Sequence, residues 1–213
     1  MEKQMTLFSL RLVVVAVISI FATQAFSQDF KMGLNFGCNY TALSFDKKAY
    51  LVWDVERKFS PRVGLIALYD SGSRFSFNST IVYDRREGQF STLGAADGLA
   101  IVTERYHYLT LSPKLQYNSK WGFFFNAGPA AGVKLKAERV RREIDLFDFA
   151  PYKTEIEHAK DVRLGFIAGV GYEITIAGIA LAPEISYDFG LRHLNGRSHS
   201  KFSSLLFGTS VFF

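Results

Sequence analysis

The feature that most constrains the fold is a strict alternation of apolar and polar residues. In residues 74–84, RFSFNSTIVYD, the large apolar residues Phe75, Phe77, Ile81 and Tyr83 take odd positions, and the polar residues Ser76, Asn78 and Thr80 lie between them. A β-strand directs successive side chains to opposite faces, so such a segment has one apolar and one polar face. Because no segment after residue 30 shows a convincing helical period, we predict an all-β protein.

Eight segments show this alternation, and the connections between them alternate in length. Short turns are predicted at 70–73, 118–121 and 175–178, and long connections at 42–58, 85–102, 137–160 and 191–200. The predicted strands are 31–41, 59–70, 74–84, 103–117, 121–136, 161–174, 178–190 and 201–213. Each can supply the roughly 9–11 residues of a tilted membrane strand. This arrangement predicts an eight-stranded antiparallel up-and-down transmembrane β-barrel in the outer membrane.

The two faces of the strands differ in a way that indicates which one meets lipid. The chain is 48% hydrophobic and 15% aromatic, and its large apolar residues gather on one face of each strand. The opposite face carries Gly, Ala, Ser and a few charged residues. An eight-stranded barrel has an interior just wide enough for side chains to fill, so we place the small and charged residues inside. Pro113, Pro129 and Pro183 fall within strands, where we expect bulges.

The first residues have the pattern of a secretory signal. Lys3 and Arg11 are followed by an apolar run over 12–22 and by AFS, which predicts cleavage before Gln28. We therefore expect residues 1–27 to be a cleaved signal peptide and 28–213 to form the barrel domain; the alternative is an uncleaved anchor. The formal net charge of +5 suits an anionic surface such as lipopolysaccharide, and an exported chain without a basic motif is not expected to bind nucleic acid.

Charged residues at inward positions form the first candidate site. We predict a network of Lys114 with Glu173 and Glu184, together with Arg163 and Asp188. Unpaired buried charges cost several kcal/mol, so these groups are expected to form ion pairs that fill the lumen. The alternative is a polar lining for a narrow pore.

The connection over 137–160 is the second candidate site. Its basic cluster predicts contact of Arg139, Arg141 and Arg142 with lipopolysaccharide phosphates. A charged hairpin that only extends the neighbouring strands, or a protein-docking tip at DLFDFAPY, would explain the same residues.

Catalysis is a weaker hypothesis. His107 and Ser79 both face outward on neighbouring predicted strands, as in a lipid-modifying enzyme, but no outward acidic residue stands at a matching depth to orient the histidine. The other histidines lack metal-ligand spacing. We therefore predict no enzymatic activity, no cofactor and no metal.

Several strands resemble a known family. The segments YHYLTLSPKLQYNSKWGFFFNAGPAAGVKL (106–135), GFIAGVGYEI (165–174) and LAPEISYDFGLRHL (181–194) are similar to Bacteroidota outer-membrane β-barrel proteins of the porin-like, PorT-type family. The resemblance implies a structural, binding or assembly role without shared catalytic residues. It also implies an alternative role as an accessory of a protein secretion system.

The segment KFSSLLFGTSVFF (201–213) ends on an aromatic pair. We expect it to be the strand that closes the barrel against the first strand. A terminal aromatic such as Phe213 resembles the signal by which outer-membrane insertion machinery recognises barrels.

Overall fold

The computed structural model describes residues 30–44, 53–93, 99–144, 152–156, 161–191 and 201–213. Residues 31–213 form one compact unit. The predicted signal peptide, residues 1–27, and the DLFDF part of the predicted docking tip lie outside the described residues. The described part of the chain holds no helix with the length and apolar character that membrane crossing requires.

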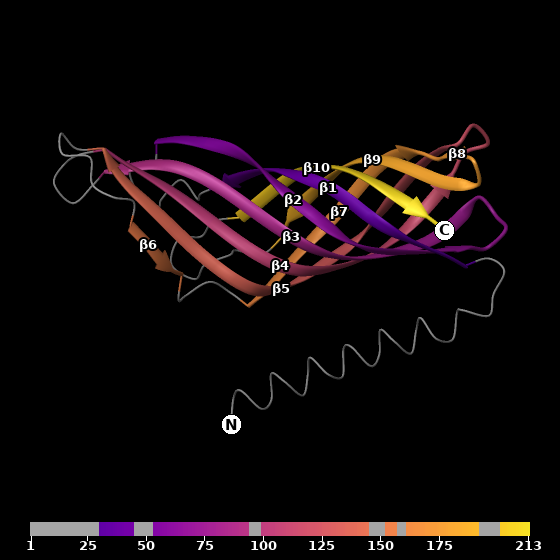
Figure 1. Cartoon of the computed structure of the whole chain (residues 1–213), viewed down its shortest axis with the longest axis horizontal. Coiled ribbons are helices and arrows are strands. Elements are labelled where there is room, and N and C mark those ends of the chain that lie inside the picture. The colour runs from indigo at the N-terminus through magenta and orange to yellow at the C-terminus, as the bar shows by residue number, and fades with distance from the viewer. Residues whose placement is uncertain (1–29, 45–52, 94–98, 145–151, 157–160, 192–200) are drawn as a thin grey trace, which may run out of the picture. The chain divides into compact units, whose positions relative to one another are not determined.

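The described residues are almost entirely β-strand (Figure 1). The strands are β1 (Phe30–Ser44), β2 (Trp53–Asp70), β3 (Phe75–Leu93), β4 (Leu99–Asn118), β5 (Phe123–Ile144), β6 (Tyr152–Glu155), β7 (Val162–Tyr172), β8 (Ile174–Ile176), β9 (Ile179–Gly190) and β10 (Lys201–Phe212).

Eight of these strands close into a ring. The hydrogen-bonded order is β10-β1-β2-β3-β4-β5-β7-β9, and β10 also pairs with β9, which closes the sheet. Of the two short strands, β8 pairs with β9 and β6 pairs with β5. The predicted eight-stranded antiparallel barrel, including closure of the last strand on the first, is therefore confirmed.

The outward and inward faces follow the predicted alternation. On the outside, large apolar side chains are exposed, with Leu115 at 58% and Phe125 at 56% of their surface. On the inside, small polar side chains are buried, such as Thr80 and Thr110 at 2% and 1%. An apolar exterior around a polar interior is the arrangement of a barrel surrounded by lipid.

Five strands, β1 to β5, are longer than predicted. β3 runs on to Leu93, β4 begins at Leu99 and β5 ends at Ile144, so much of the predicted connections 85–102 and 137–160 is strand. β5 has 22 residues and β7 has 11. At about 3.3 Å per residue, β5 is roughly twice as long as the lipid crossing requires. β2, β3, β4 and β5 therefore extend past the other strands at the end opposite the short turns (Figure 1, left).

The predicted bulges at the prolines are wrong. Pro113 pairs with Ser79, Pro129 with Phe166 and Pro183 with Thr209 in unbroken register. A residue at a non-hydrogen-bonded position of an antiparallel pair donates nothing to that neighbour, so a proline there needs no bulge. A register shift does occur between β4 and β5, where His107 pairs with Lys136 and Tyr108 with Lys134, leaving Leu135 as the extra residue. It reverses the inward and outward positions of β5 beyond Leu135.

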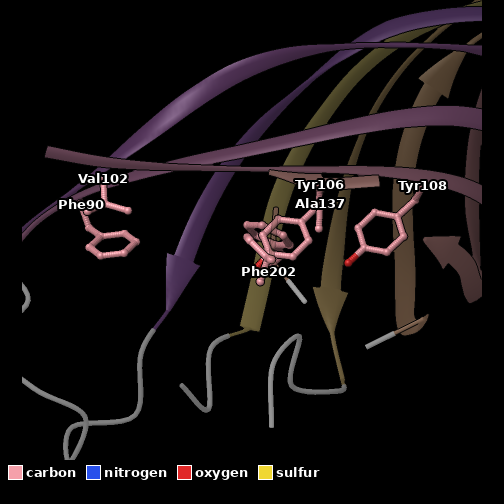
Figure 2. Packing of buried hydrophobic residues seen from close by; sticks show 7 residues of the cluster. Phe90, Val102, Tyr106, Tyr108, Ala137 and Phe202 are labelled. Atoms are coloured by element: carbon pink, nitrogen blue, oxygen red, sulfur yellow. The ribbon is translucent and has the colours of Figure 1, made fainter. Parts of the chain in front are cut away.

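Buried apolar side chains occupy both ends of the lumen. Near the short turns, one cluster consists of Ile66, Leu68, Phe124, Ala182 and Phe212. Toward the other end, a second cluster consists of Phe90, Val102, Tyr106, Tyr108, Ala137, Ile156 and Phe202. Figure 2 shows Tyr106, Ala137 and Phe202 close together, and the rings of Tyr106 and Phe202 meet edge to face at 5.1 Å.

The seam between β1 and β10 suggests a test of the terminal aromatic. The Phe213 amide donates to the Met32 carbonyl at 3.1 Å, while its side chain is 81% exposed. The ring therefore adds little packing to the folded barrel. If it is a recognition signal, deletion of Phe213 should lower the amount of folded protein in the outer membrane, measured by the difference in gel migration between boiled and unboiled membranes. Phe213→Tyr, which keeps an aromatic ring, is the control; unchanged levels after the deletion would refute the signal.

Candidate functional site

A cluster of buried charges crosses the lumen near the ends of β7 and β9 that lie away from the short turns. Arg86 donates from Nε to Asp84 Oδ2 at 2.8 Å and from Nη2 to Asp188 Oδ2 at 2.6 Å. Arg163 forms an ion pair with the same Asp188 oxygen. The side chains of all four residues are at most 2% exposed. The positive charges of two arginines thus neutralise the negative charges of two aspartates. This matters here because a buried charge without a counter-charge is strongly destabilising.

Two neutral side chains complete this cluster. Asn39 donates to Asp84, and Arg86 Nη1 donates to Ser204 Oγ at 3.0 Å. The contributing residues lie on β1, β3, β7, β9 and β10. The ion cluster therefore joins strands from opposite sides of the barrel. A change in its charge would weaken contacts between all of these strands.

The sequence identified half of this cluster. Arg163 and Asp188 were predicted to lie in the lumen, and the structure places them together. Asp84 was taken as the end of its strand and Arg86 was assigned to a connection, so neither was included. The available signal was the continued alternation beyond residue 84, which places Arg86 on the same face as Thr80 and Val82.

The predicted network around Lys114 is only partly formed. Lys114 Nζ lies 3.0 Å from Glu184 Oε1, and both side chains are buried. Glu173 instead lies 3.5 Å from Lys31, where its side chain is 31% exposed. Glu173 follows β7 at the short-turn end, where a carboxylate reaches solvent and needs no deep partner. The five predicted residues thus belong to separate groups at different depths.

The lumen beside Lys114 and Glu184 is nearly filled. A cavity of about 10 Å³ lies there, lined partly by Asn78, Gln116 and Phe124. This volume is at the lower limit for a single water molecule. An ion pair, an apolar cluster and a water-sized space indicate a plugged interior at this depth.

The three arginines predicted to bind lipopolysaccharide do not form one surface. Arg139 and Arg141 pair with Glu104 and Val102, which face inward, and Arg139 Nε donates to Glu104 Oε1 at 3.0 Å. Arg142 pairs with Ile101 on the opposite face. The bulge at Leu135 exchanges the two faces of β5, a change that alternation alone did not predict.

An outward charged belt lies directly beyond the lipid-facing residues of β3, β4 and β5. The last apolar row contains Tyr83, Leu109 and Val133. The next outward row contains Arg85, His107 and Lys136, and the row after it Glu87, Arg105 and Glu138. We call these two charged rows the outer belt.

Ion pairs within the outer belt are shared. Glu87 pairs with Arg85 and, at 3.2 Å, with Arg105. Glu138 pairs with Lys136 and, at 3.1 Å, with Lys153 of β6. Hydrogen bonds from the two lysines lower the pKa of Glu138, which lies beyond the apolar band, to about 2. This carboxylate is therefore ionised at neutral pH.

The structure separates the residues of the hypothetical lipid-modifying enzyme. Ser79 pairs with Pro113, whereas His107 pairs with Arg85. Six residues of strand between Pro113 and His107 correspond to about 20 Å. Ser79 and His107 therefore do not form the pair that the enzyme hypothesis requires, and His107 Nδ1 instead lies 2.6 Å from the Tyr83 hydroxyl. The described residues also include no group of three His, Cys, Asp or Glu side chains suited to a metal ion.

A family model supports the assignment of this fold. The model described as "Outer membrane protein beta-barrel domain" matches residues 24–196. No curated protein sequence matches the chain significantly.

Among solved structures, the chain is similar to other outer-membrane proteins at low identity. Ail of Yersinia pestis is 8% identical, with 87% of this chain and 100% of that chain covered and a TM-score of 0.45. Neisserial surface protein A is 12% identical, with 87% and 98% covered and a TM-score of 0.41. OprG from Pseudomonas aeruginosa is 12% identical, with 86% and 95% covered and a TM-score of 0.39.

The ion cluster predicts a large difference between two aspartates. Asp188→Asn keeps the shape of the side chain but leaves Arg86 and Arg163 without their shared counter-charge, so we expect a loss of about 3–5 kcal/mol in the free energy of unfolding. The control is Asp161→Asn, because Asp161 pairs with Lys134 at 2.9 Å but is 85% exposed, and we expect at most about 1 kcal/mol.

Urea unfolding of the refolded barrel in detergent micelles, followed by far-ultraviolet circular dichroism, measures both values. Equal losses for the two variants would show that the buried cluster does not stabilise the barrel.

Proposed function

We propose that this chain, which belongs to the outer membrane protein beta-barrel domain family and is an outer-membrane protein, acts as a binding protein at the cell surface. The observation that carries the proposal is the extension of β2, β3, β4 and β5 beyond the apolar band. Short turns of outer-membrane barrels face the periplasm, so the extended sheet is directed to the outside of the cell.

The interior of the barrel supports a role other than transport. The ion cluster of Arg86 and its partners crosses the lumen, one apolar cluster packs near the short turns, and another packs toward the opposite end. An eight-stranded barrel leaves no room for a channel beside such groups. The closed barrel acts in this proposal as a rigid anchor.

The exterior supports a role other than catalysis. His107 stands far from Ser79 and contacts Tyr83 instead, so the nucleophile and base that a lipid-modifying enzyme needs are not brought together. We therefore propose a non-enzymatic protein.

Assembly and secretion are further proposals for the same anchor. Phe213 directly follows β10 and has an exposed side chain, which suits contact with the outer-membrane insertion machinery during assembly. The resemblance of several strands to PorT-type proteins supports a second proposal, that the protein is an accessory of a protein secretion system. In that case the extended sheet would bind another component of the system.

A closed lumen predicts the absence of channel activity. Purified protein reconstituted into a planar lipid bilayer should give no single-channel current steps, because the ion cluster and the apolar clusters block ion passage. A general porin in the same bilayer is the positive control. Reproducible current steps from the protein itself would contradict the closed-anchor proposal.

The extended sheet can be shortened without changing the membrane part of the barrel. Gly88 and Glu104 pair across β3 and β4, so residues 89–103 can be replaced by an Asn-Gly turn, which suits a two-residue hairpin. We expect the shortened barrel to fold, with a gel-migration shift on boiling, and to lose surface partners that the full-length protein cross-links on whole cells. An identical set of cross-linked partners would exclude the removed segment as the binding surface.

A further inference from the structure

The outer belt has an ordered charge pattern that ion pairing alone does not require. Arg85, His107 and Lys136 form the row next to the apolar band, while both carboxylates stand one row farther from it. Positive groups thus come first beyond the lipid-facing surface. This order matches a membrane surface whose headgroups are anionic.

The two cations next to the apolar band are more exposed than the two carboxylates of the belt. The side chains of Arg85 and Lys136 are 32% and 57% exposed, whereas those of Glu87 and Glu138 are 12% and 9% exposed. Lys153 and Glu155 of β6 adjoin the belt, and Glu155 pairs in register with Glu138. The four cations Arg85, Arg105, Lys136 and Lys153 then stand against the three carboxylates Glu87, Glu138 and Glu155, 4 − 3 = 1, so a net charge of +1 remains with His107 neutral. The exposed surface of the belt is therefore suited to an anion.

His107 lies between the two cations in the same row. Neighbouring strands are about 4.8 Å apart, so the side chains of Arg85 and Lys136 are anchored about 10 Å apart with the histidine at the centre. The Tyr83 hydroxyl donates to His107 Nδ1 at 2.6 Å in the neutral tautomer that carries its hydrogen on Nε2. This leaves Nε2–H as the remaining donor of the ring. Three donors in register can surround one phosphate group.

We propose that Arg85, His107 and Lys136 bind a phosphate of lipid A, the phosphorylated glycolipid of the outer leaflet. The site lies one row beyond Tyr83, Leu109 and Val133, on the side of the apolar band opposite the short turns. In the proposed orientation this side faces the outside of the cell, where lipid A forms the membrane surface. The proposal rests on the outer-membrane orientation used in the proposed function, but on neither the closed lumen nor the extended sheet as a binding surface. Arg139 and Arg141, on the inward face, take no part in it.

The variant Arg85→Gln/Lys136→Gln tests the site without breaking the belt. Glu87 keeps Arg105 and Glu138 keeps Lys153, so neither carboxylate loses all its counter-charge. The matched control is Arg74→Gln/Lys120→Gln, which removes the same two charges from exposed positions in the short turns at the opposite end.

Binding is measured in phosphatidylcholine vesicles that contain increasing mole fractions of lipid A. The readout is the rise in the temperature at which the folded band on a detergent gel disappears. For the wild type and the control variant we expect stabilisation by lipid A. For Arg85→Gln/Lys136→Gln the mole fraction at half-maximal stabilisation should rise about tenfold, because each basic side chain near an anionic surface contributes severalfold to binding.

A second series with phosphatidylglycerol separates a phosphate site for lipid A from attraction to any anionic lipid. Weaker stabilisation by phosphatidylglycerol, with little difference between the two variants, supports the proposal. Equal stabilisation by both lipids would overturn the assignment to lipid A. The same response of both variants to lipid A would overturn the site itself, while leaving the channel measurement and the surface cross-linking of the proposed function unaffected.

Discussion

The narrow lumen of an eight-stranded barrel is the constraint on which the rest of the structure depends. Its interior has room for side chains and little else, so each inward group must find its partner within the wall. Arg86 satisfies this requirement by binding Asp84 and Asp188 at once, with Arg163 as the balancing charge. A neutral cluster of this kind avoids the cost of an unpaired buried charge and connects strands that are not neighbours in the sheet.

Because the interior is filled by its own groups, the binding role proposed for this protein falls to the exterior and to the extended strands. The apolar rows of β3, β4 and β5 end at Tyr83, Leu109 and Val133, and charged rows follow at once. The same sheet then continues past the shorter strands (Figure 1). Successive regions of one continuous sheet thus contact the lipid tails, lie at the membrane surface and extend beyond it. The residue types change between these regions because each environment solvates a different kind of side chain.

Much of the fold could be predicted from the sequence, while the candidate sites could be predicted only in part. The period of two identified the eight strands of the ring and separated an apolar face from a polar face on each. The narrow interior of such a barrel then assigned the polar face, with Arg163 and Asp188, to the lumen. Arg86 was missed because the charged residues after Asp84 resemble a connection, although they continue the alternation. Arg139 was misplaced because one extra residue in β5 reverses the direction of the side chains that follow it.

The sequence by itself determined the all-β architecture and the separation of apolar from polar residues on each strand, because alternation is a local property of neighbouring residues. It also indicated which strand closes the ring. Only the tertiary structure decided which charges meet, since pairs such as Arg86 with Asp188 or His107 with Lys136 depend on strand register and on the shift at Leu135. Register is set by contacts between strands distant in the chain, and no local pattern contains that information.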